Sequence, residues 1–246
     1  MLVQSNHIKN HRILHLKKHD YEKWVGGMMN IAIVGLGFVG LSLTSVLASK
    51  GYRTVGIDVD IEKCKKISNG FSPFFEPYLE RTLRSGLKKK LTISSDFSLI
   101  KNCDYIFVTV GTPQSTDGTI ELSMIKKAAK SIGKTMNKNK KNQTIFIKST
   151  VVPGTIKNIV LPILEKTSNK IADKDFGLIS NPEFLQESSA IKDTKFPHAV
   201  VLGGDKTKYM NKAKNFFQKL HPKTPIILTN HQTAEIIKYA NNSFLA

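Results

Sequence analysis

The chain of 246 residues carries a formal net charge of +18 at pH 7, contains two cysteines and is 40% hydrophobic. This is enough for one large globular domain or two small ones, and no apolar run reaches the roughly 18 residues that cross a membrane. Two cysteines exclude a disulfide framework and favour a reducing compartment, so we expect a cytoplasmic protein without a signal peptide.

The positive charge is spread over pairs of lysines along the whole chain. Neither zinc-finger spacing nor an aromatic RNA-binding signature accompanies it, so we expect no nucleic-acid partner. A basic surface attracts small anionic ligands instead, and we prefer this interpretation.

Residues 1–27 do not share the residue pattern of the rest of the chain. His7, His11, His15 and His19 recur at every fourth position and would share one face of a helix, where they could bind a metal ion. No carboxylate or cysteine ligand set completes such a site. We therefore predict no metal site, and a poorly ordered extension whose removal leaves folding unchanged.

From Asn30 onwards, short apolar runs alternate with stretches of helical periodicity. Strands are predicted at Ile31–Val34, Thr54–Asp58, Tyr105–Val110, Thr144–Ile147, Gly177–Ser180, Ala199–Leu202 and Ile226–Leu228. Helices are predicted at Val39–Lys50, Ile61–Asn69, Leu122–Ile132, Thr155–Glu165, Lys206–Leu220 and Thr233–Ala246, the last capped by Thr233. The alternation predicts an α/β fold with a doubly wound, mostly parallel sheet and helices on both faces.

The first strand leads into a G-x-G-x-x-G pattern that opens a helix, which is typical of a Rossmann-type dinucleotide-binding domain. Gly35 permits the tight turn, Gly37 lets the backbone approach a pyrophosphate, and Gly40 lets the helix pack against the strand. The pyrophosphate would lie at the positive end of this helix. The residues assigned to the cofactor here are Gly35, Gly37, Phe38, Val39 and Gly40.

Asp58 ends the second predicted strand, where a carboxylate accepts hydrogen bonds from the adenosine ribose and repels a 2′-phosphate. We therefore predict that the cofactor is NAD rather than NADP. Lys63, one helical turn further on, could reach the ribose or a phosphate, and the alternative is a solvated lysine.

Three further segments combine the carboxyl end of a predicted strand with small hydroxyls or a carboxylate and then a turn. They are Val110–Pro113, Lys148–Thr155 and Asn181–Ser188. Each alone is typical of a strand-to-helix loop with a capping residue. Because ligands of open α/β sheets bind at the carboxyl ends of the strands, the three together indicate a ligand site.

The order and spacing of these motifs resemble the UDP-glucose/GDP-mannose 6-dehydrogenase family. The resemblance runs from Asn30 to the end and rests on Gly35–Gly40, Asp58, Glu76-Pro77, Val110–Pro113, Ser149–Thr155, Asn181–Ser188 and Ala234–Ala246. It implies NAD-dependent oxidation of the C6 alcohol of a nucleotide sugar to a carboxylate, with two NAD per sugar. In that family a cysteine thiolate traps the intermediate aldehyde, and water hydrolyses the resulting thioester. UDP-glucose is the substrate we expect first, and GDP-mannose or another nucleotide sugar is the alternative.

The resemblance also implies roles for individual residues. Glu183 would act as a base or orient water in thioester hydrolysis, and Thr150 would help to hold that water. Lys238 would stabilise negative charge on the C6 oxygen, and Asn242, one helical turn later, would help to hold the sugar or the water. The implied substrate contacts are Glu183, Phe184, Leu185, Lys238 and Asn242, and the further cofactor contacts are Val110, Gly111, Thr112, Pro113, Ser149, Thr150 and Glu187.

The chain departs from the family pattern at three places. The family nucleophile lies in a Gly-x-Cys-x-Pro context, and neither Cys64 nor Cys103 has that context, so we interpret both as structural. Tyr78 stands where the family usually has glycine. The segment Phe196–Ala199 leans towards GDP-mannose members, whereas Phe244–Ala246 leans towards UDP-glucose members.

The final predicted helix has no stop signal, although Glu235 suits the positive end of its first turn. We therefore expect a truncated chain with an extension at 1–27 and an NAD-binding domain at 28–229. The resemblance implies that 230–246 are the start of a central helix that pairs the subunits of a full-length homodimer. The nucleophile and the sugar-nucleotide domain would be absent, so the chain would bind NAD without turnover. The alternatives are a stand-alone, inactive NAD-binding module and a 3-hydroxyacid dehydrogenase; the carboxylates of Asn181–Ser188 argue against the latter.

Overall fold

The structure is a computed structural model that describes residues 29–137 and 139–245. The histidine row at 7–19 and the proposed extension at 1–27 lie outside the described residues. Within them, an eight-stranded sheet has the order β3-β2-β1-β4-β5-β6-β7-β8. The strands are β1 (Asn30–Val34), β2 (Arg53–Ile57), β3 (Leu91–Ser94), β4 (Tyr105–Val108), β5 (Thr144–Ile147), β6 (Gly177–Ser180), β7 (Val200–Gly203) and β8 (Ile226–Thr229).

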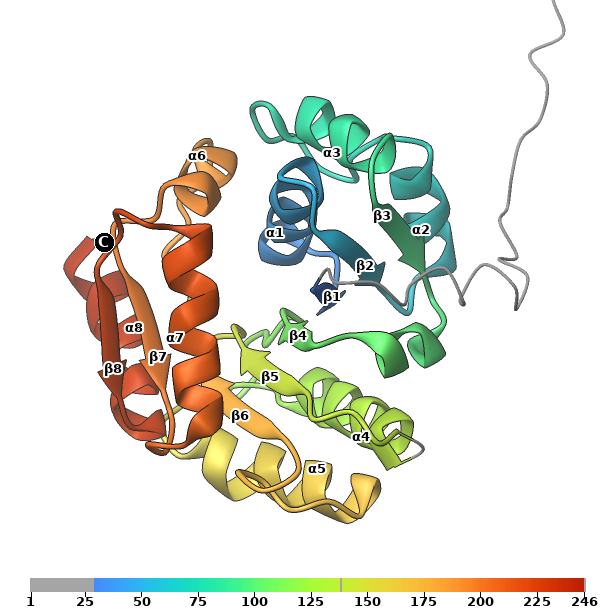
Figure 1. The fold of residues 1–246 in the computed structure, drawn as a ribbon. Helices are drawn as coiled ribbons and strands as arrows, with labels where there is room; N and C mark the ends of the chain where they lie inside the picture. The colour runs from blue at the N-terminus through green and yellow to red at the C-terminus, as the bar shows by residue number, and fades with distance from the viewer. Residues whose placement is uncertain (1–28, 138, 246) are drawn as a thin grey trace, which may run out of the picture.

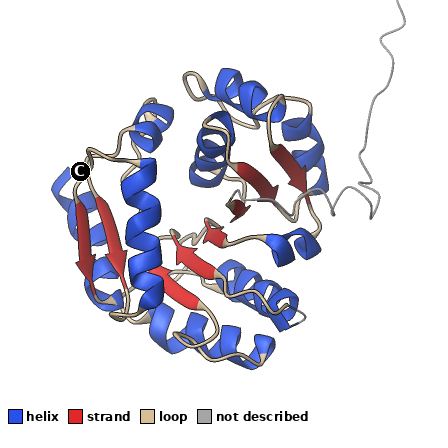
Figure 2. Ribbon diagram, in the orientation of Figure 1, coloured by secondary structure: helices blue, strands red, loops and turns tan. Residues whose placement is uncertain are grey.

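Helices cover both faces of this sheet, which confirms the predicted α/β, doubly wound, Rossmann-type fold (Figures 1 and 2). They are α1 (Phe38–Ser49), α2 (Ile61–Ser68), α3 (Leu79–Leu87), α4 (Ser123–Asn137), α5 (Leu161–Ser168), α6 (Ala190–Lys195), α7 (Lys208–Leu220) and α8 (His231–Leu245), with a 3-10 turn η2 (Phe97–Asn102) and a π-helical turn η3 (Ile156–Val160). None of the described helices is long and apolar enough to cross a membrane.

Two apolar clusters fill the space between the sheet and its helices. The first packs α1, α3, α6 and α7 against one face and includes the stacked rings of Phe107 and Phe146. The second packs α4, α5 and η3 against the other face. Both clusters draw on strands that are buried along their whole length and mostly apolar, as expected where helices cover both faces of a parallel sheet.

The direction of the sheet reverses between β6 and β7, which pair antiparallel at Ser180 and Gly203 only. The other neighbouring strands are parallel, including β7 with β8. The carboxyl ends of β1, β2, β4, β5 and β6 therefore meet at one edge, which is where ligands bind in such sheets. Because β7 and β8 run the opposite way, β8 ends near the carboxyl end of β6, and α8 begins there and packs against β7 and β6.

Several short elements were not predicted, namely α3, β3, α6 and η2. The strand β3 is an edge strand of four residues whose side chains are mostly half-buried, so it lacks a strong apolar pattern. The helix α6 has six residues, too few to show a helical period.

The last helix begins earlier than the sequence predicted. The helix α8 begins at His231 rather than Thr233, and the cap is the side chain of Asn230, whose Oδ1 accepts the N–H of Thr233 at 2.8 Å. Asparagine is as strong an N-cap as threonine, so both candidates fitted the pattern and only the backbone geometry distinguishes them.

Candidate active site

The glycine-rich turn after β1 has the tight backbone turn and the close helix approach that the sequence predicted from its three glycines. Gly35 has a φ of +97°, and a Cβ there would lie 2.8 Å from the backbone nitrogen of Val110. A Cβ on Gly40 would overlap the carbonyl oxygen of Gly35, so α1 packs against the turn without a side chain between them. Gly37 faces open space, since a Cβ added there would have no neighbouring atom within 4 Å. The exposed backbone at Gly37 is therefore accessible to a ligand at the N-terminus of α1.

Asp58 follows β2 and is buried, with 7% of its surface exposed. One carboxylate oxygen accepts the N–H of Leu36 in the glycine-rich turn at 2.8 Å, and the other accepts the N–H of Asp60 at 3.0 Å. Lys63, in the first turn of α2, lies 3.1 Å from Asp58 through its ammonium nitrogen. Lys63 is thus paired with Asp58 rather than solvated. Asp58 holds the glycine-rich turn in shape through its hydrogen bond to Leu36 and also places a negative charge beside that turn.

The loops after β4 and β5 are held together by their own hydroxyls. Thr112 donates its hydroxyl to the carbonyl of Thr150 at 2.6 Å, and Ser149 donates its hydroxyl to the carbonyl of Val110 at 2.7 Å. Their oxygens can still accept hydrogen bonds. The segments Val110–Pro113 and Lys148–Thr155 therefore form one surface beside the glycine-rich turn, as the sequence predicted.

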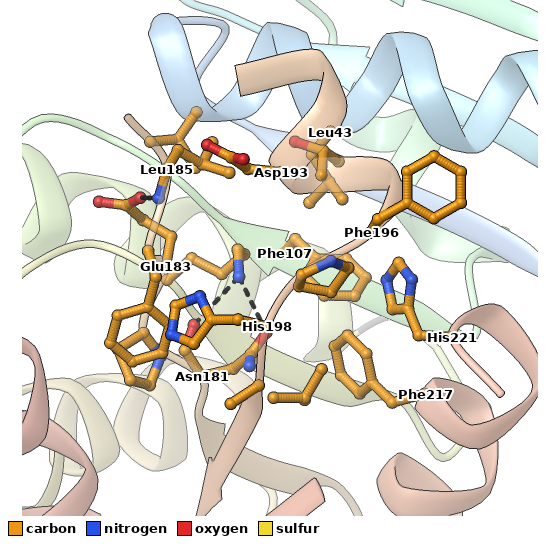
Figure 3. Close-up of a pocket in the computed structure, with 18 of the residues that line it drawn as sticks. Leu43, Phe107, Asn181, Glu183, Leu185, Asp193, Phe196, His198, Phe217 and His221 are labelled. Atoms are coloured by element: carbon orange, nitrogen blue, oxygen red, sulfur yellow. Dashed lines mark hydrogen bonds between the residues drawn. The ribbon is translucent and has the colours of Figure 1, made fainter. Parts of the chain in front are cut away.

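The centre of this edge is an ion pair between Glu183, in the loop after β6, and Lys238 on α8. Oε1 of Glu183 lies 2.8 Å from Nζ of Lys238, and the two side chains are 14% and 7% exposed. The other carboxylate oxygen accepts the N–H of Leu185 at 2.6 Å, a bond drawn in Figure 3. The Lys238 ammonium also lies 5.8 Å from the ring centre of Phe184. Both oxygens of Glu183 are consequently fixed in direction.

The remaining predicted residues surround this pair at different depths. Phe184 and Leu185 are half-buried beside it, and the Phe184 ring lies 5.2 Å from that of His198. Glu187 is exposed further along the same loop. Asn242 is exposed one turn beyond Lys238, and none of the hydrogen bonds found among the described residues joins it to Glu183. The structure thus brings Glu183 and Lys238 together and leaves Asn242 and Glu187 open to solvent.

Lys148 belongs to the same centre but was not predicted as a site residue. It lines a cavity of about 280 Å³ between α1, α7 and the loop after β6, together with Phe107, Glu183 and His221 (Figure 3). Its ammonium donates to the backbone carbonyl of Asn181 at 3.3 Å and to the side-chain oxygen of Asn181 at 3.1 Å. Desolvation in this enclosed position lowers the pKa of Lys148 to about 8, opposed by the charge of Glu183. A lysine at the end of an otherwise apolar strand was the signal in the sequence.

Glu76 is a buried carboxylate that ties the segment Glu76-Pro77 to the site. It accepts the N–H groups of Ser188 at 3.0 Å and of Ala190 at 2.9 Å, and so fixes the loop after β6 where it enters α6.

Glu235 is also a buried carboxylate, and its predicted role was wrong. It does not serve the first turn of its own helix but accepts the N–H groups of Gly154 at 2.6 Å and Ile156 at 2.9 Å. Burial raises the pKa of Glu235, opposed by these two donors. Each of the two carboxylates spans segments far apart in sequence, which no local pattern reveals.

Both cysteines are free, buried thiols: Cys64 lies in α2, with its Sγ 3.5 Å from the backbone oxygen of Asp58, and Cys103 directly precedes β4. Burial raises the pKa of both thiols, that of Cys103 to about 12. A thiol reacts as its thiolate, so neither is an activated nucleophile here. Among the described residues, no cluster of His, Cys, Asp and Glu side chains could hold a metal ion.

Comparison with known proteins identifies the family to which this chain belongs. Residues 29–221 match the sequence profile of the UDP-glucose/GDP-mannose dehydrogenase family, NAD binding domain. The chain belongs to the UDP-glucose/GDP-mannose dehydrogenase family. The matched region is the NAD-binding domain, and the cofactor of this domain is NAD.

The relatives act on nucleotide sugars. A GDP-mannose 6-dehydrogenase of Pseudomonas syringae pv. tomato is 40% identical over 216 residues, which cover 87% of this chain and 49% of the relative. A UDP-glucose 6-dehydrogenase of Haloferax volcanii is 32% identical over 221 residues, which cover 89% of this chain and 51% of the relative. The chain therefore spans about half the length of the curated relatives it matches.

Solved structures show the same likeness in three dimensions. The GDP-mannose dehydrogenase of Pseudomonas aeruginosa, solved as a ternary complex, superposes with a TM-score of 0.84 at 36% identity, over 88% of this chain and 50% of that one. A UDP-glucose dehydrogenase of Pyrobaculum islandicum superposes with a TM-score of 0.81 at 30% identity, over 89% of this chain and 50% of that one.

Proposed function

We propose that this chain is the NAD-binding part of a nucleotide-sugar 6-dehydrogenase, with residues 28–229 as the cofactor domain and 230–246 as the start of a central helix. The observation that supports this best is the buried ion pair of Glu183 and Lys238 at the edge where the glycine-rich turn also lies. An oriented carboxylate beside an ammonium suits a reaction that removes a proton from an alcohol and accumulates negative charge on its oxygen.

The residues at this edge fit NAD. The pyrophosphate would bind the backbone at Gly37, and the ribose hydroxyls would use the carboxylate of Asp58, with Lys63 beside it. Val59 and Ile61 are largely exposed next to Asp58 and offer an apolar surface to the adenine ring. The nicotinamide end would lie along Val110–Pro113, Ser149, Thr150 and Glu187. When bound, NAD supplies the hydride acceptor.

The protein groups would then handle the proton and the charge at the sugar C6 atom. The ammonium of Lys238 would stabilise negative charge on the C6 oxygen, and Glu183 would accept a proton or orient water. Thr150 and Asn242 would help to hold the water and the sugar, while Phe184 and Leu185 would shield the reacting atoms from bulk solvent. Since Lys238 and Glu183 already hold each other and Glu183 also accepts the N–H of Leu185, these two groups need little reorganisation.

We expect the 246 residues alone to bind NAD without completing the oxidation to a carboxylate. The family reaction needs a thiolate at the sugar aldehyde, and both cysteines of this chain are buried with raised pKa values, Cys64 beside Asp58 and Cys103 before β4. Continuous NADH production by this chain from UDP-glucose or GDP-mannose would contradict this expectation. The full-length enzyme is proposed to be a homodimer joined through the central helix.

GDP-mannose should be tested before UDP-glucose, which was the first expectation from the sequence. The segment Phe196–Ala199, which leans towards GDP-mannose members, lies next to the site: His198 contacts Phe184, and Phe196 lines the same cavity. Relatives from Pseudomonas at 37–40% identity are GDP-mannose 6-dehydrogenases.

The proposed activity can be tested in a chimera of residues 29–245 with the C-terminal half of the Pseudomonas syringae relative, whose unmodified form is the control. With GDP-mannose and NAD we expect two NADH per sugar. Glu183→Gln should slow thioester hydrolysis, and Lys238→Met should slow the first hydride transfer, each by roughly a hundredfold or more. A chimera that folds and binds NAD but forms no NADH would overturn the proposal.

A further inference from the structure

Lys148 holds the turn of the chain that follows β6. The ammonium lies between the backbone carbonyl and the side-chain oxygen of Asn181, at 3.3 and 3.1 Å. The side-chain amide of Asn181 donates to the carbonyl of Val201 at 2.9 Å, and its backbone N–H donates to Ile147 at 2.8 Å. With Lys148 in place, the backbone N–H, the backbone carbonyl, the side-chain N–H and the side-chain oxygen of Asn181 all have hydrogen-bond partners.

This anchoring acts directly on the loop that carries Glu183. Asn181 directly follows β6, at the point where the sheet reverses direction, and Pro182 comes next with no N–H to contribute. A residue before proline is confined to extended backbone conformations. Lys148 supplies a further constraint, since it joins this turn to the end of the neighbouring strand β5.

Lys148 also interacts electrostatically with the ion pair of Glu183 and Lys238. Burial has the largest effect on the pKa of Lys148 and lowers it to about 8, Glu183 raises it, and Lys238 lowers it further. Two ammonium groups and the Glu183 carboxylate therefore interact here, and the carboxylate of Asp193 on α6 lines the same cavity. The carboxylate of Glu183 thus feels the charge state of Lys148 as well as that of its partner Lys238.

We propose that Lys148 is a positioning residue, which fixes the Asn181-Pro182 turn and thereby holds Glu183 opposite Lys238. The proposal concerns the same site as the proposed function and rests on it only for the reaction that Glu183 serves. In this role Lys148 acts through its two hydrogen bonds to Asn181.

The test is carbon NMR on this chain labelled at the glutamate carboxyl carbons, with Glu183→Gln to assign the signal. In the unmodified chain we expect the Glu183 signal to shift near pH 8, where the ammonium of Lys148 loses its proton. The other buried base in the cavity, His221, does not titrate there, because burial lowers the pKa of His221 to about 4. Lys148→Met should abolish this step and speed exchange of the Leu185 amide by about tenfold or more.

Lys170→Met is the matched control. Lys170 also donates to two backbone carbonyls, those of Asn139 at 2.6 Å and Lys141 at 3.4 Å, but on another part of the molecule. This variant should keep both the step near pH 8 and the slow exchange at Leu185. If the unmodified chain shows no step, or if folded Lys148→Met retains either the step or the slow exchange at Leu185, the proposal is wrong. Because the unmodified chain decides by itself, a Lys148→Met variant that fails to fold does not leave the question open, and failure of the activity test would not affect this result.

Discussion

Glu183 and Lys238 form an ion pair of 2.8 Å between a loop after β6 and the second turn of α8. The pair exists because the sheet reverses direction at β7: β7 and β8 end beside the carboxyl end of β6, so α8 begins at the edge where the parallel strands end. The loop after β6 and the helix α8, which follow strands of opposite direction, therefore meet at this edge. The consequence is a charged site that depends on the reversal as much as on the glycine-rich turn.

Removing the cation from this pair should destabilise the chain strongly. Lys238→Met leaves the Glu183 carboxylate largely buried without its partner, and breaking a buried pair costs about 3–5 kcal/mol. The double variant Glu183→Gln, Lys238→Met should recover part of that loss, because no unpaired charge remains. The control is Lys65→Met, which breaks the exposed Lys65–Glu62 pair and should cost about 0.5 kcal/mol or less. Urea unfolding measures all four chains, and equal losses for Lys238→Met and Lys65→Met would contradict the burial argument.

Asp58 should make this chain prefer NAD to NADP by at least about tenfold in affinity, since its carboxylate repels a 2′-phosphate. Asp58→Asn keeps an acceptor for the N–H of Leu36 while removing the charge, so it should narrow the preference without unfolding the turn. Lys63→Met should widen it, because the ammonium 3.1 Å away offsets the carboxylate. Calorimetric titration measures both affinities. Asp96→Asn, at an exposed aspartate that accepts the N–H of Ser98, is the control, and an unchanged ratio in Asp58→Asn would show that the ribose binds elsewhere.

Glu235 should divide α8 into a protected and an unprotected part. Its carboxylate is 3% exposed and fastens the helix to the loop after β5, whereas Phe244 near the end is 90% exposed. We expect slow amide exchange around Ala234–Lys238 and fast exchange beyond. Glu235→Gln turns an amide N–H₂ towards a backbone N–H and should speed exchange at Gly154, Ile156 and Lys238. Glu165→Gln, at a carboxylate that accepts the N–H of Ala172, should leave these amides unchanged, and uniform exchange along α8 would contradict the anchoring role.

Acid should destabilise the chain through His221. Burial, reinforced by the charge of Lys50, lowers the pKa of His221 from 6.5 to about 4, so the unfolded chain binds more protons than the folded chain between these values. Stability is therefore lost as pH falls from about 6.5 to about 4, by at most about 3 kcal/mol from this group. His221→Phe, which retains a ring against Phe217, should flatten this part of the pH profile of the melting temperature. His198→Phe, at an exposed histidine of the same cavity, should not, and equal profiles for the two variants would contradict the assignment.

The sequence predicted the parts of this site that depend on local pattern. Gly35, Gly40 and Asp58 lie where the G-x-G-x-x-G spacing placed them, because a tight turn and a close helix approach allow few other residues. Tyr78 shows a further local rule: it has a φ of +64°, the left-handed conformation that favours the glycine usual in the family.

The sequence could not predict the contacts that cross the fold. Glu76 and Glu235 each bind backbone N–H groups far along the chain, and only the packed structure reveals which groups those are. Lys148 begins one of the three strand-end segments, but its partner Asn181 lies after the next strand. The short helix α6 was missed because its six residues are too few to show a period, whereas α3 has leucines at every fourth position, Leu79, Leu83 and Leu87, and this signal was overlooked.

The most direct test of the cofactor site is an NAD titration of this chain followed through its backbone amide signals. We predict saturable shifts at Gly35–Gly40, Asp58, Val110–Thr112 and Ser149–Thr150, all at the edge where the parallel strands end. Shifts of this kind with NAD, and much weaker ones with NADP, would support the cofactor site and its specificity together. No saturable shifts at this edge, or shifts confined to another face of the sheet, would contradict the central claim.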